Sequence, residues 1–219
     1  TWAYSYGKSQ NVNPNLGWEE KKEWNLGVDY SFFEGRLYGK FDYYRREVDN
    51  LLFSVKVPQP PYTQGSQMQN IGSMESKGWE FEVGGDIIRT KDFTWSSSMN
   101  LSHNTGKILT LEGDNSYHNG NGFVAPGTPG DAARMEAGST IGSFYMWKFA
   151  GFDDEGSFLL YNKDGEVIPA AQKTENDKQY IGNYTPKLII GWSHTLTYKN
   201  FDLGINLRSW IDFDVFNTI

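Results

Sequence analysis

Residues 188–208 read LIIGWSHTLTYKNFDLGINLR, and apolar and polar side chains alternate along both halves of this stretch. In the second half, Leu203, Ile205 and Leu207 fall on one side. A period of two is typical of a β-strand, because successive side chains of a strand point to opposite faces. Lys199–Asn200 separates the two halves as a short turn, so the stretch predicts an antiparallel hairpin.

The same alternation recurs earlier in the chain, in residues 24–32, 37–44, 79–87 and 93–102. Glu34–Gly35 joins the first two of these segments and Thr90–Asp92 joins the last two, which predicts two more hairpins. Longer connections, residues 49–77 and 106–186, are rich in Gly, Pro, Asn, Ser and Tyr. The pattern therefore predicts an all-β, antiparallel fold with short turns at one end and long loops at the other.

The two faces of these six segments differ in charge. In the central part of the strands, His194 is the only ionisable residue on the apolar face. The ionisable residues of the other face are Asp29, Lys40, Asp42, Glu80, Glu82, Asp86, Asp202 and Arg208. A Lys or Arg on the lipid face of a membrane barrel costs about 2–4 kcal/mol at mid-bilayer, whereas a wet lumen tolerates charge. This segregation favours a transmembrane β-barrel.

Strand length and aromatic placement favour the same fold. Segments of about 9–13 residues suit tilted membrane strands, since strands of soluble proteins average about 5–6 residues. Aromatic residues gather where the strands meet the short turns, as in an interfacial girdle. These residues are Phe32, Phe33, Phe93, Trp95, Tyr198 and Phe201. A soluble β-sandwich that binds glycans is the alternative fold, because its strands also alternate.

Six strands are too few to close around a polar lumen, since about eight strands enclose only side chains. An open edge cannot face lipid either. We therefore expect residues 1–219 to be part of one transmembrane β-barrel domain that the rest of the same polypeptide completes. The chain starts at Thr1 without a signal sequence and stops just after an alternating segment, without a turn or a polar tail, which we interpret as a fragment.

Composition excludes several other classes of protein. The 219 residues contain no Cys, which excludes disulfides and cysteine-based zinc sites. With 20 Lys and Arg against 27 Asp and Glu, the net charge is −7, so a strongly basic nucleic-acid binder is not expected. His103, His118 and His194 are scattered without ligand spacing, and Glu80 and Glu82 are neighbours on one strand face. We expect no enzyme activity, no metal and no cofactor.

Seven short strings occur in a defined order: NPNLGWE (13–19), NIGSM (70–74), GWEFE (78–82), DFTW (92–95), LSHN (101–104), IGNYTPK (181–187) and YKNFDL (198–203). In this order and spacing the chain resembles the C-terminal part of SusC/RagA-like TonB-dependent outer-membrane transporters of Bacteroidota. The resemblance covers roughly residues 11–213.

This resemblance implies a large barrel of about 22 strands with a plugged lumen, located in the bacterial outer membrane. It also implies an N-terminal plug that contacts TonB and a SusD-like surface lipoprotein that covers the barrel. Such a transporter imports oligosaccharides or peptides. This chain contains neither the plug nor the segment that contacts TonB, so a passive porin stays open as an alternative. Where the family often has an Asp-rich turn, Lys163 replaces a carboxylate, and no Ca²⁺ site is assigned.

Aromatic residues in the long connections are the candidates for ligand contact, because aromatic rings beside Asn, Asp and Gln can bind sugars. The candidates are Tyr62, Tyr117, His118, Phe144, Tyr145 and Trp147. They could instead pack the loops together or contact the lipoprotein. Lys148 and the family resemblance place residues 144–152 in an extracellular hairpin that ends near Asp153–Gly156, rather than in a membrane strand.

Overall fold

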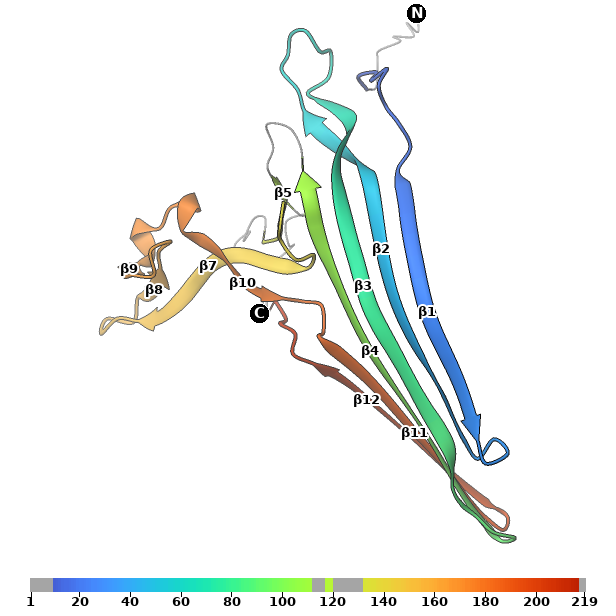
Figure 1. The fold of residues 1–219 in the computed structure, drawn as a ribbon. Helices are drawn as coiled ribbons and strands as arrows, with labels where there is room; N and C mark the ends of the chain where they lie inside the picture. The colour runs from blue at the N-terminus through green and yellow to red at the C-terminus, as the bar shows by residue number, and fades with distance from the viewer. Residues whose placement is uncertain (1–9, 112–116, 120–131, 217–219) are drawn as a thin grey trace, which may run out of the picture.

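The computed structural model describes residues 10–111 and 132–216, together with the backbone of residues 117–119. Six long strands form one antiparallel sheet in the order β1-β2-β3-β4-β11-β12 (Figure 1). These strands are β1 (Glu20–Phe32), β2 (Leu37–Lys56), β3 (Ser66–Arg89), β4 (Phe93–Leu111), β11 (Leu188–Tyr198) and β12 (Phe201–Ile211). The three predicted hairpins, β1–β2, β3–β4 and β11–β12, are confirmed.

The short turns lie at the lower end of the sheet in Figure 1. The β1–β2 turn places Phe33, Glu34 and Gly35 at positive φ angles of 56°, 55° and 84°. Lys199 adopts a φ angle of 53° in the β11–β12 turn. Consecutive left-handed residues reverse the chain tightly, which keeps each pair of strands in register up to the turn.

The prediction of a long loop over residues 49–77 is wrong, because β2 and β3 continue as a paired ribbon to Lys56 and from Ser66. Only residues 57–65 form the loop. The sequence of this ribbon has no regular apolar alternation. Polar side chains hydrogen-bond to the backbone there instead. Asn70 Nδ2, for example, donates to the carbonyl oxygens of Gly17 and Asn50 at 3.1 and 2.7 Å.

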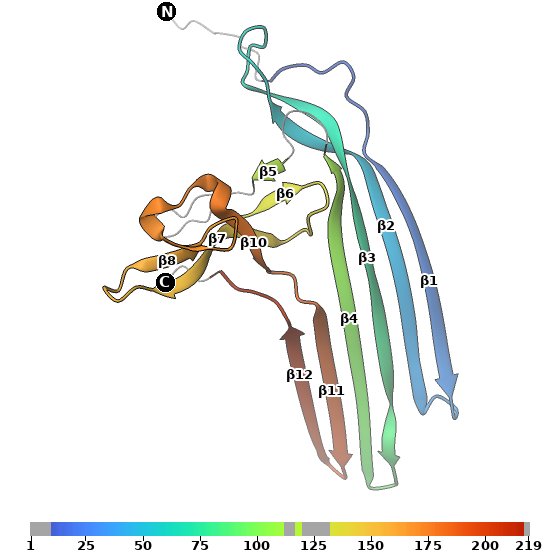
Figure 2. The ribbon, with the colours of Figure 1, turned by 60° about the vertical axis from the view of Figure 1, so that its left-hand side comes forward.

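Smaller sheets project from one side of the upper end of the large sheet, as Figures 1 and 2 both show. One contains, in order, β10 (Lys178–Asn183), β7 (Ser143–Phe152), β8 (Phe158–Tyr161) and β9 (Val167–Pro169). The other pairs β5 (Tyr117–Asn119) with β6 (Arg134–Glu136). The position of β7 outside the large sheet agrees with the predicted hairpin of residues 144–152.

Beyond the end of β11 at Leu188, residues 138–141 bond to the edge of β4 in place of β11. The backbone N–H of Ile108 donates to the carbonyl oxygen of Ser139 at 3.0 Å, and that of Ile141 donates to Gly106 at 2.9 Å. Ile141 also packs against Gly106, where a Cβ atom would come within 3.0 Å of its side chain. Among the described residues the buried apolar side chains are Val55, Ile71, Ile108, Ala132 and Phe144. Most of them lie at this upper end.

The described residues include two short 3-10 turns, η1 (Ala170–Gln172) and η2 (Glu175–Asp177). Within that part of the chain, no helix is long and apolar enough to cross a membrane.

Candidate functional site

One face of the large sheet is apolar across strands that are far apart in the sequence. In register, Val28 lies opposite Phe41, Phe41 opposite Phe81, and Phe81 opposite Leu101. Leu101 in turn lies opposite Ile190 on β11. Large apolar side chains on this face are exposed, and the exposed fraction of Val28 is 56%. A continuous apolar surface of this kind needs an apolar environment to cover it.

The opposite face is a polar wall, which we define as the side of the sheet that carries the charged strand residues. One register row runs from Asp29 to Lys40, to Glu82, to Asn100 and, beyond Gly191, to Arg208. Lys40 Nζ lies 3.5 Å from a carboxylate oxygen of Glu82. The register therefore brings together charged residues from four strands, as the alternation predicts.

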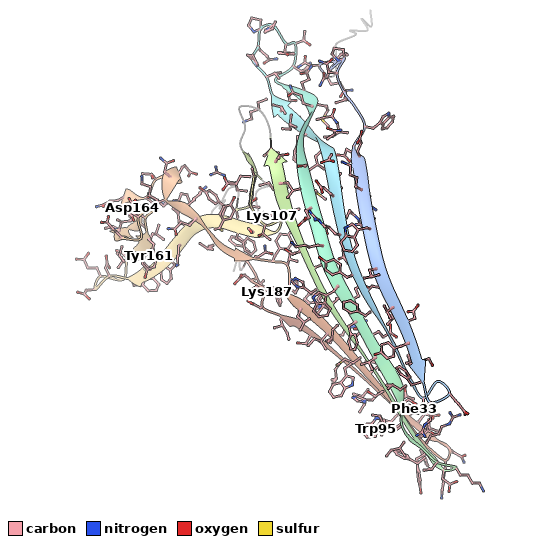
Figure 3. All side chains as sticks on the ribbon, in the orientation of Figure 1. Phe33, Trp95, Lys107, Tyr161, Asp164 and Lys187 are labelled. Atoms are coloured by element: carbon pink, nitrogen blue, oxygen red, sulfur yellow. The ribbon has the colours of Figure 1, made fainter. Side chains whose placement is uncertain are left out.

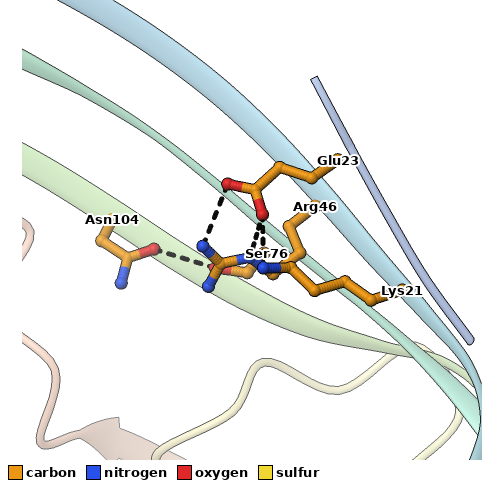
Figure 4. Close-up of polar contacts among 5 residues, drawn as sticks. All are labelled: Lys21, Glu23, Arg46, Ser76 and Asn104. Carbon is orange, nitrogen blue, oxygen red and sulfur yellow. Dashed lines mark hydrogen bonds and ion pairs between the residues drawn. The ribbon is translucent and has the colours of Figure 1, made fainter. Parts of the chain in front are cut away.

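Above this row, charged groups form a polar chain along the same wall (Figure 4). The guanidinium of Arg46 donates to both carboxylate oxygens of Glu23 at 3.1 Å, and Lys21 Nζ pairs with the same carboxylate at 2.5 Å. Nearby, Ser76 Oγ donates to Asn104 Oδ1 at 3.2 Å. A bidentate Arg–carboxylate pair holds both side chains in one geometry.

Sequence reasoning missed this polar chain because the alternating segments were cut at Trp24 and Tyr44. Continuing the alternation by one or two residues places Glu23 and Arg46 on the polar wall. A shallow cavity of about 430 Å³ lies beside this polar chain. Its lining consists of Glu23, Asn25, Asp42, Tyr44, Arg46, Ser76, Glu80 and Asn104.

The middle of the polar wall has an acidic character. Asp42 and Glu80 lie directly opposite each other on β2 and β3. Neither carboxylate has an ion-pair partner within the described part of the chain. Together with the amides of Asn25 and Asn104, they present hydrogen-bond acceptors and donors to whatever fills the space beside the wall. This arrangement can bind polar molecules.

Three of the candidate aromatic residues lie together on β7. Tyr145 Oη accepts a hydrogen bond from Arg134 Nη1 at 2.9 Å, and its ring lies 5.1 Å from that of Tyr180. Trp147 Nε1 donates to the carbonyl oxygen of Thr174 at 2.7 Å. Phe144, by contrast, is buried. These contacts fix the rings of Tyr145 and Trp147.

The indole of Trp147 is also held by cations. Lys178 Nζ lies 4.5 Å from the ring centroid, and Lys173 Nζ lies 5.2 Å away. Such contacts contribute about 0.5–1 kcal/mol at exposed sites. The sequence alone gave no sign of these partners, because they come from 26 or more residues further along the chain.

The other candidates are spread over different elements. The ring of Phe144 packs against those of Tyr184 and Phe216, each 6.1 Å away between centroids. Tyr62 lies half-buried in the loop between β2 and β3. The backbones of Tyr117 and His118 lie in β5, but their side chains fall outside the described part of the structure. Ligand contact by the six residues stays a prediction.

Residues 1–212 match the protein-family model described as TonB dependent receptor-like, beta-barrel. The chain belongs to this family. The chain is 34% identical to the TonB-dependent receptor P3 of Formosa agariphila, and 33% identical to the TonB-dependent receptor SusC of Bacteroides thetaiotaomicron. Each match covers 94% of the chain, but only 22% and 21% of these relatives. The chain thus spans about a fifth of their length.

The chain also resembles the solved structure of the RagAB peptide importer in the open-open state. The TM-score is 0.76 with 27% sequence identity, and the match covers 94% of the chain and 22% of that structure. The six-stranded sheet is therefore part of a TonB-dependent receptor-like β-barrel, as the SusC/RagA-like resemblance predicted. The named relatives are receptors and transporters rather than enzymes.

The chain also has an exposed Phe cluster, formed by Phe149, Phe152 and Phe158 on the β7–β8 hairpin. The three side chains are 51–59% exposed. Their ring centroids are 5.0, 5.2 and 5.9 Å apart. Three mutually packed rings that stay open to solvent are typical of a protein interaction surface.

Asp177 in the turn η2 and Tyr180 in β10 of the small sheet have shifted pKa values. Asp177 accepts hydrogen bonds from Thr174 Oγ1 and the Thr174 N–H, both at 2.7 Å, and from the Lys163 N–H at 3.2 Å. These donors lower the pKa of its carboxyl. Burial, followed by a hydrogen bond to Glu136 and the charge of that residue, raises the pKa of Tyr180 to about 12.

The turn that replaces the family's Asp-rich turn is closed by its own hydrogen bonds. Asn162 Oδ1 accepts from the backbone N–H groups of Asp164 and Glu166 at 3.0 and 2.8 Å. Figure 3 places Tyr161 and Asp164 on the small sheets, away from the large one. In the described residues, no group of three or more His, Cys, Asp and Glu side chains could hold a metal ion.

Proposed function

We propose that this chain is part of a TonB-dependent importer of oligosaccharides or peptides in the bacterial outer membrane. The observation that carries this proposal is the separation of the sheet into an apolar face and a polar wall, continuous across six strands. Lipid would cover the apolar face, and the polar wall would line the lumen. Membership of the receptor family supports the same assignment.

The described strands form one section of the barrel domain. Within the described residues, β1 pairs only with β2, and β12 pairs only with β11. Open strand edges are not tolerated in lipid, so strands from the remainder of the polypeptide complete the barrel. The same remainder supplies the plug, through which TonB delivers energy. This domain assignment is supported by relatives about five times as long as the chain.

A SusD-like lipoprotein is the proposed partner on the outside of the cell. The exposed Phe cluster offers it an apolar contact at the end of the small sheet that lies farthest from the large sheet (Figure 1). Aromatic side chains contribute strongly at protein interfaces when they become buried. Replacing Phe152 and Phe158 with Ser should therefore weaken retention of the lipoprotein without preventing barrel assembly.

Ligand contact is proposed for the polar wall and for the aromatic residues of the extracellular segments. Tyr62 and Trp147 are half-buried and keep part of their rings accessible, as does Tyr145. Tyr117, His118 and Phe144 belong to the same proposed set. Polar groups of the wall would hydrogen-bond to hydroxyl or amide groups of an oligosaccharide or peptide as it passes.

The test begins with a detergent pull-down of the tagged full-length protein from outer membranes, followed by mass spectrometry. Recovery with a surface lipoprotein is expected. Recovery from the aqueous fraction without membrane partners would favour the soluble β-sandwich. Uptake of labelled oligosaccharides and peptides is then compared in cells with and without TonB. Loss of uptake without TonB is expected, whereas uptake that persists would favour the passive porin.

A further inference from the structure

A groove of about 520 Å³ crosses the apolar face close to the β1–β2 turn. Its lining is mostly apolar and comes from strands β2, β3, β4 and β11. Residues along it include Leu37, Val83, Ile87, Met99 and Trp192. The groove lies on the side of the sheet that faces lipid in the proposed importer, and not on the polar wall.

Two small residues in register create the hollow. Gly85 lies opposite Leu37 on one side and opposite Ser97 on the other. The nearest atoms to a Cβ on Gly85 would be backbone atoms of Arg36 and Leu37. At Gly39 on the same face, by contrast, the ring of Tyr30 covers the glycine. Gly85 and Ser97 therefore form a low part of the surface, and the larger side chains that line the groove surround them.

The floor of the groove has its polar groups satisfied within the protein. Trp192 Nε1 donates to Ser97 Oγ at 2.9 Å. Asp86 also lines the groove, but its carboxylate is engaged on the polar side of the sheet, where it accepts from Ser96 Oγ at 2.7 Å and lies 3.4 Å from Arg89 Nη1. Because these donors and acceptors are already engaged, the groove suits a hydrocarbon chain better than a polar ligand.

A cation borders the end of the groove at the short turns. Arg36 belongs to the β1–β2 turn, lines the groove and is exposed. No salt bridge between described residues includes Arg36. Phe33, in the same turn, is 75% exposed, as expected of an aromatic residue at a membrane interface. An apolar groove that ends at a free cation matches the two parts of an anionic phospholipid.

We propose that this groove binds a phospholipid of the periplasmic leaflet. One acyl chain lies over Gly85 and Ser97, and the phosphate pairs with Arg36. The inference rests on the proposed function for its orientation, since the short turns face the periplasm in such barrels. It adds a lipid site on the outside of the barrel wall, separate from the path of the transported ligand.

Native mass spectrometry of the full-length transporter tests the site, with dioleoyl phosphatidylglycerol added to the detergent-solubilised protein. Arg36→Gln removes the cation and should weaken retention of the lipid about five-fold. Ser97→Leu fills the hollow with an apolar side chain and should also reduce retention. Lys91→Gln, in the β3–β4 turn, and Ile205→Phe, on the apolar face outside the groove, are matched controls that should retain lipid as the wild type does.

Retention by Arg36→Gln and Ser97→Leu equal to that of the wild type would overturn the lipid site. Retention of lipid A in place of phosphatidylglycerol, or occupation of the groove by a second copy of the transporter, would also overturn it. Both variants should transport normally, because the groove lies outside the lumen. A failed lipid site with intact TonB-dependent uptake leaves the proposed function standing, whereas loss of that uptake in the wild type contradicts the proposed function itself.

Discussion

Trp95 and His194 meet on the apolar face of the sheet, where the indole Nε1 of Trp95 donates to Nδ1 of His194 at 3.3 Å. The ring of Trp192 lies 4.5 Å from the imidazole between centroids. Nδ1 of His194 thus has a hydrogen-bond donor from a neighbouring strand. This hydrogen bond gives a polar partner to the one ionisable residue predicted in the central part of the apolar face.

Trp95→Phe is expected to destabilise the folded barrel, because it leaves a polar nitrogen of His194 without its donor. His194→Leu should be less harmful, since it removes the polar group itself. A double-mutant cycle in detergent or lipid vesicles should give a coupling of about 1 kcal/mol between the two residues. Strictly additive effects of the two substitutions would show that the hydrogen bond contributes nothing to stability.

The assignment of the two faces makes a direct prediction for arginine substitutions. Val28→Arg places a charge on the apolar face and should cost about 2–4 kcal/mol near mid-bilayer. Ser98→Arg, on the polar wall, should leave folding almost unchanged. Heat-modifiability of the outer-membrane protein on gels measures folding of both variants. Equal folding of the two variants would contradict the face assignment.

Glycines of the large sheet differ in how closely they are covered. A Cβ on Gly39 would meet the carbonyl of Glu82 and the ring of Tyr30, whereas one on Gly204, in the edge strand β12, meets no described atom within 4 Å. Gly39→Val should therefore destabilise the barrel by about 1–3 kcal/mol, as overpacking does. Gly204→Val serves as the matched control, and denaturant unfolding compares them. A similar loss for both variants would point to strand propensity rather than to packing.

Acid should loosen the small sheet around Asp177. The folded-state pKa of this carboxyl is lowered, first by the Thr174 hydroxyl and then by backbone N–H groups. Its contribution to stability is therefore present above the unfolded pKa of about 3.9 and is lost as the pH falls through the folded pKa. Hydrogen-exchange protection of residues 163–178, corrected for intrinsic rates, should fall over that range.

Asp177→Asn provides the control for this pH dependence. The amide keeps an acceptor oxygen but has no charge to titrate, so its protection should start lower and stay flat below pH 5. A wild-type protein whose protection does not change on acidification would contradict the role given to Asp177. The large sheet should keep its protection in both proteins, because none of these donors belongs to it.

The six long strands could be predicted because two environments impose one pattern on them. Apolar residues such as Leu26 and Leu203 must face one side, and polar residues such as Asp29 and Asp202 the other. A shift of register by one residue would exchange the two sets, so alternation and short turns together determine the pairing. The observed register confirms both the strands and their faces.

The upper part of the molecule could not be predicted in the same way. The extensions of β2 and β3 depend on side-chain support, such as that from Asn70, which has no periodicity. The contacts of Trp147 with Lys173 and Lys178 join residues separated along the chain by whole elements. The contribution of Phe144 to the buried residues depends likewise on Tyr184 and Phe216. Such long-range contacts leave no local signal in the sequence.

In the proposed importer the sheet separates lipid from a wet lumen, and two adjacent residues of β4 test this separation most directly. The chain has no Cys, so single cysteines at Asn100 and Leu101 can each carry a nitroxide spin label in the full-length protein. Collision with oxygen, which dissolves in lipid, is compared with collision with a water-soluble nickel complex. We expect the label at 101 to collide more with oxygen and the label at 100 to collide more with the nickel complex. Equal access of nickel to both positions would contradict this separation.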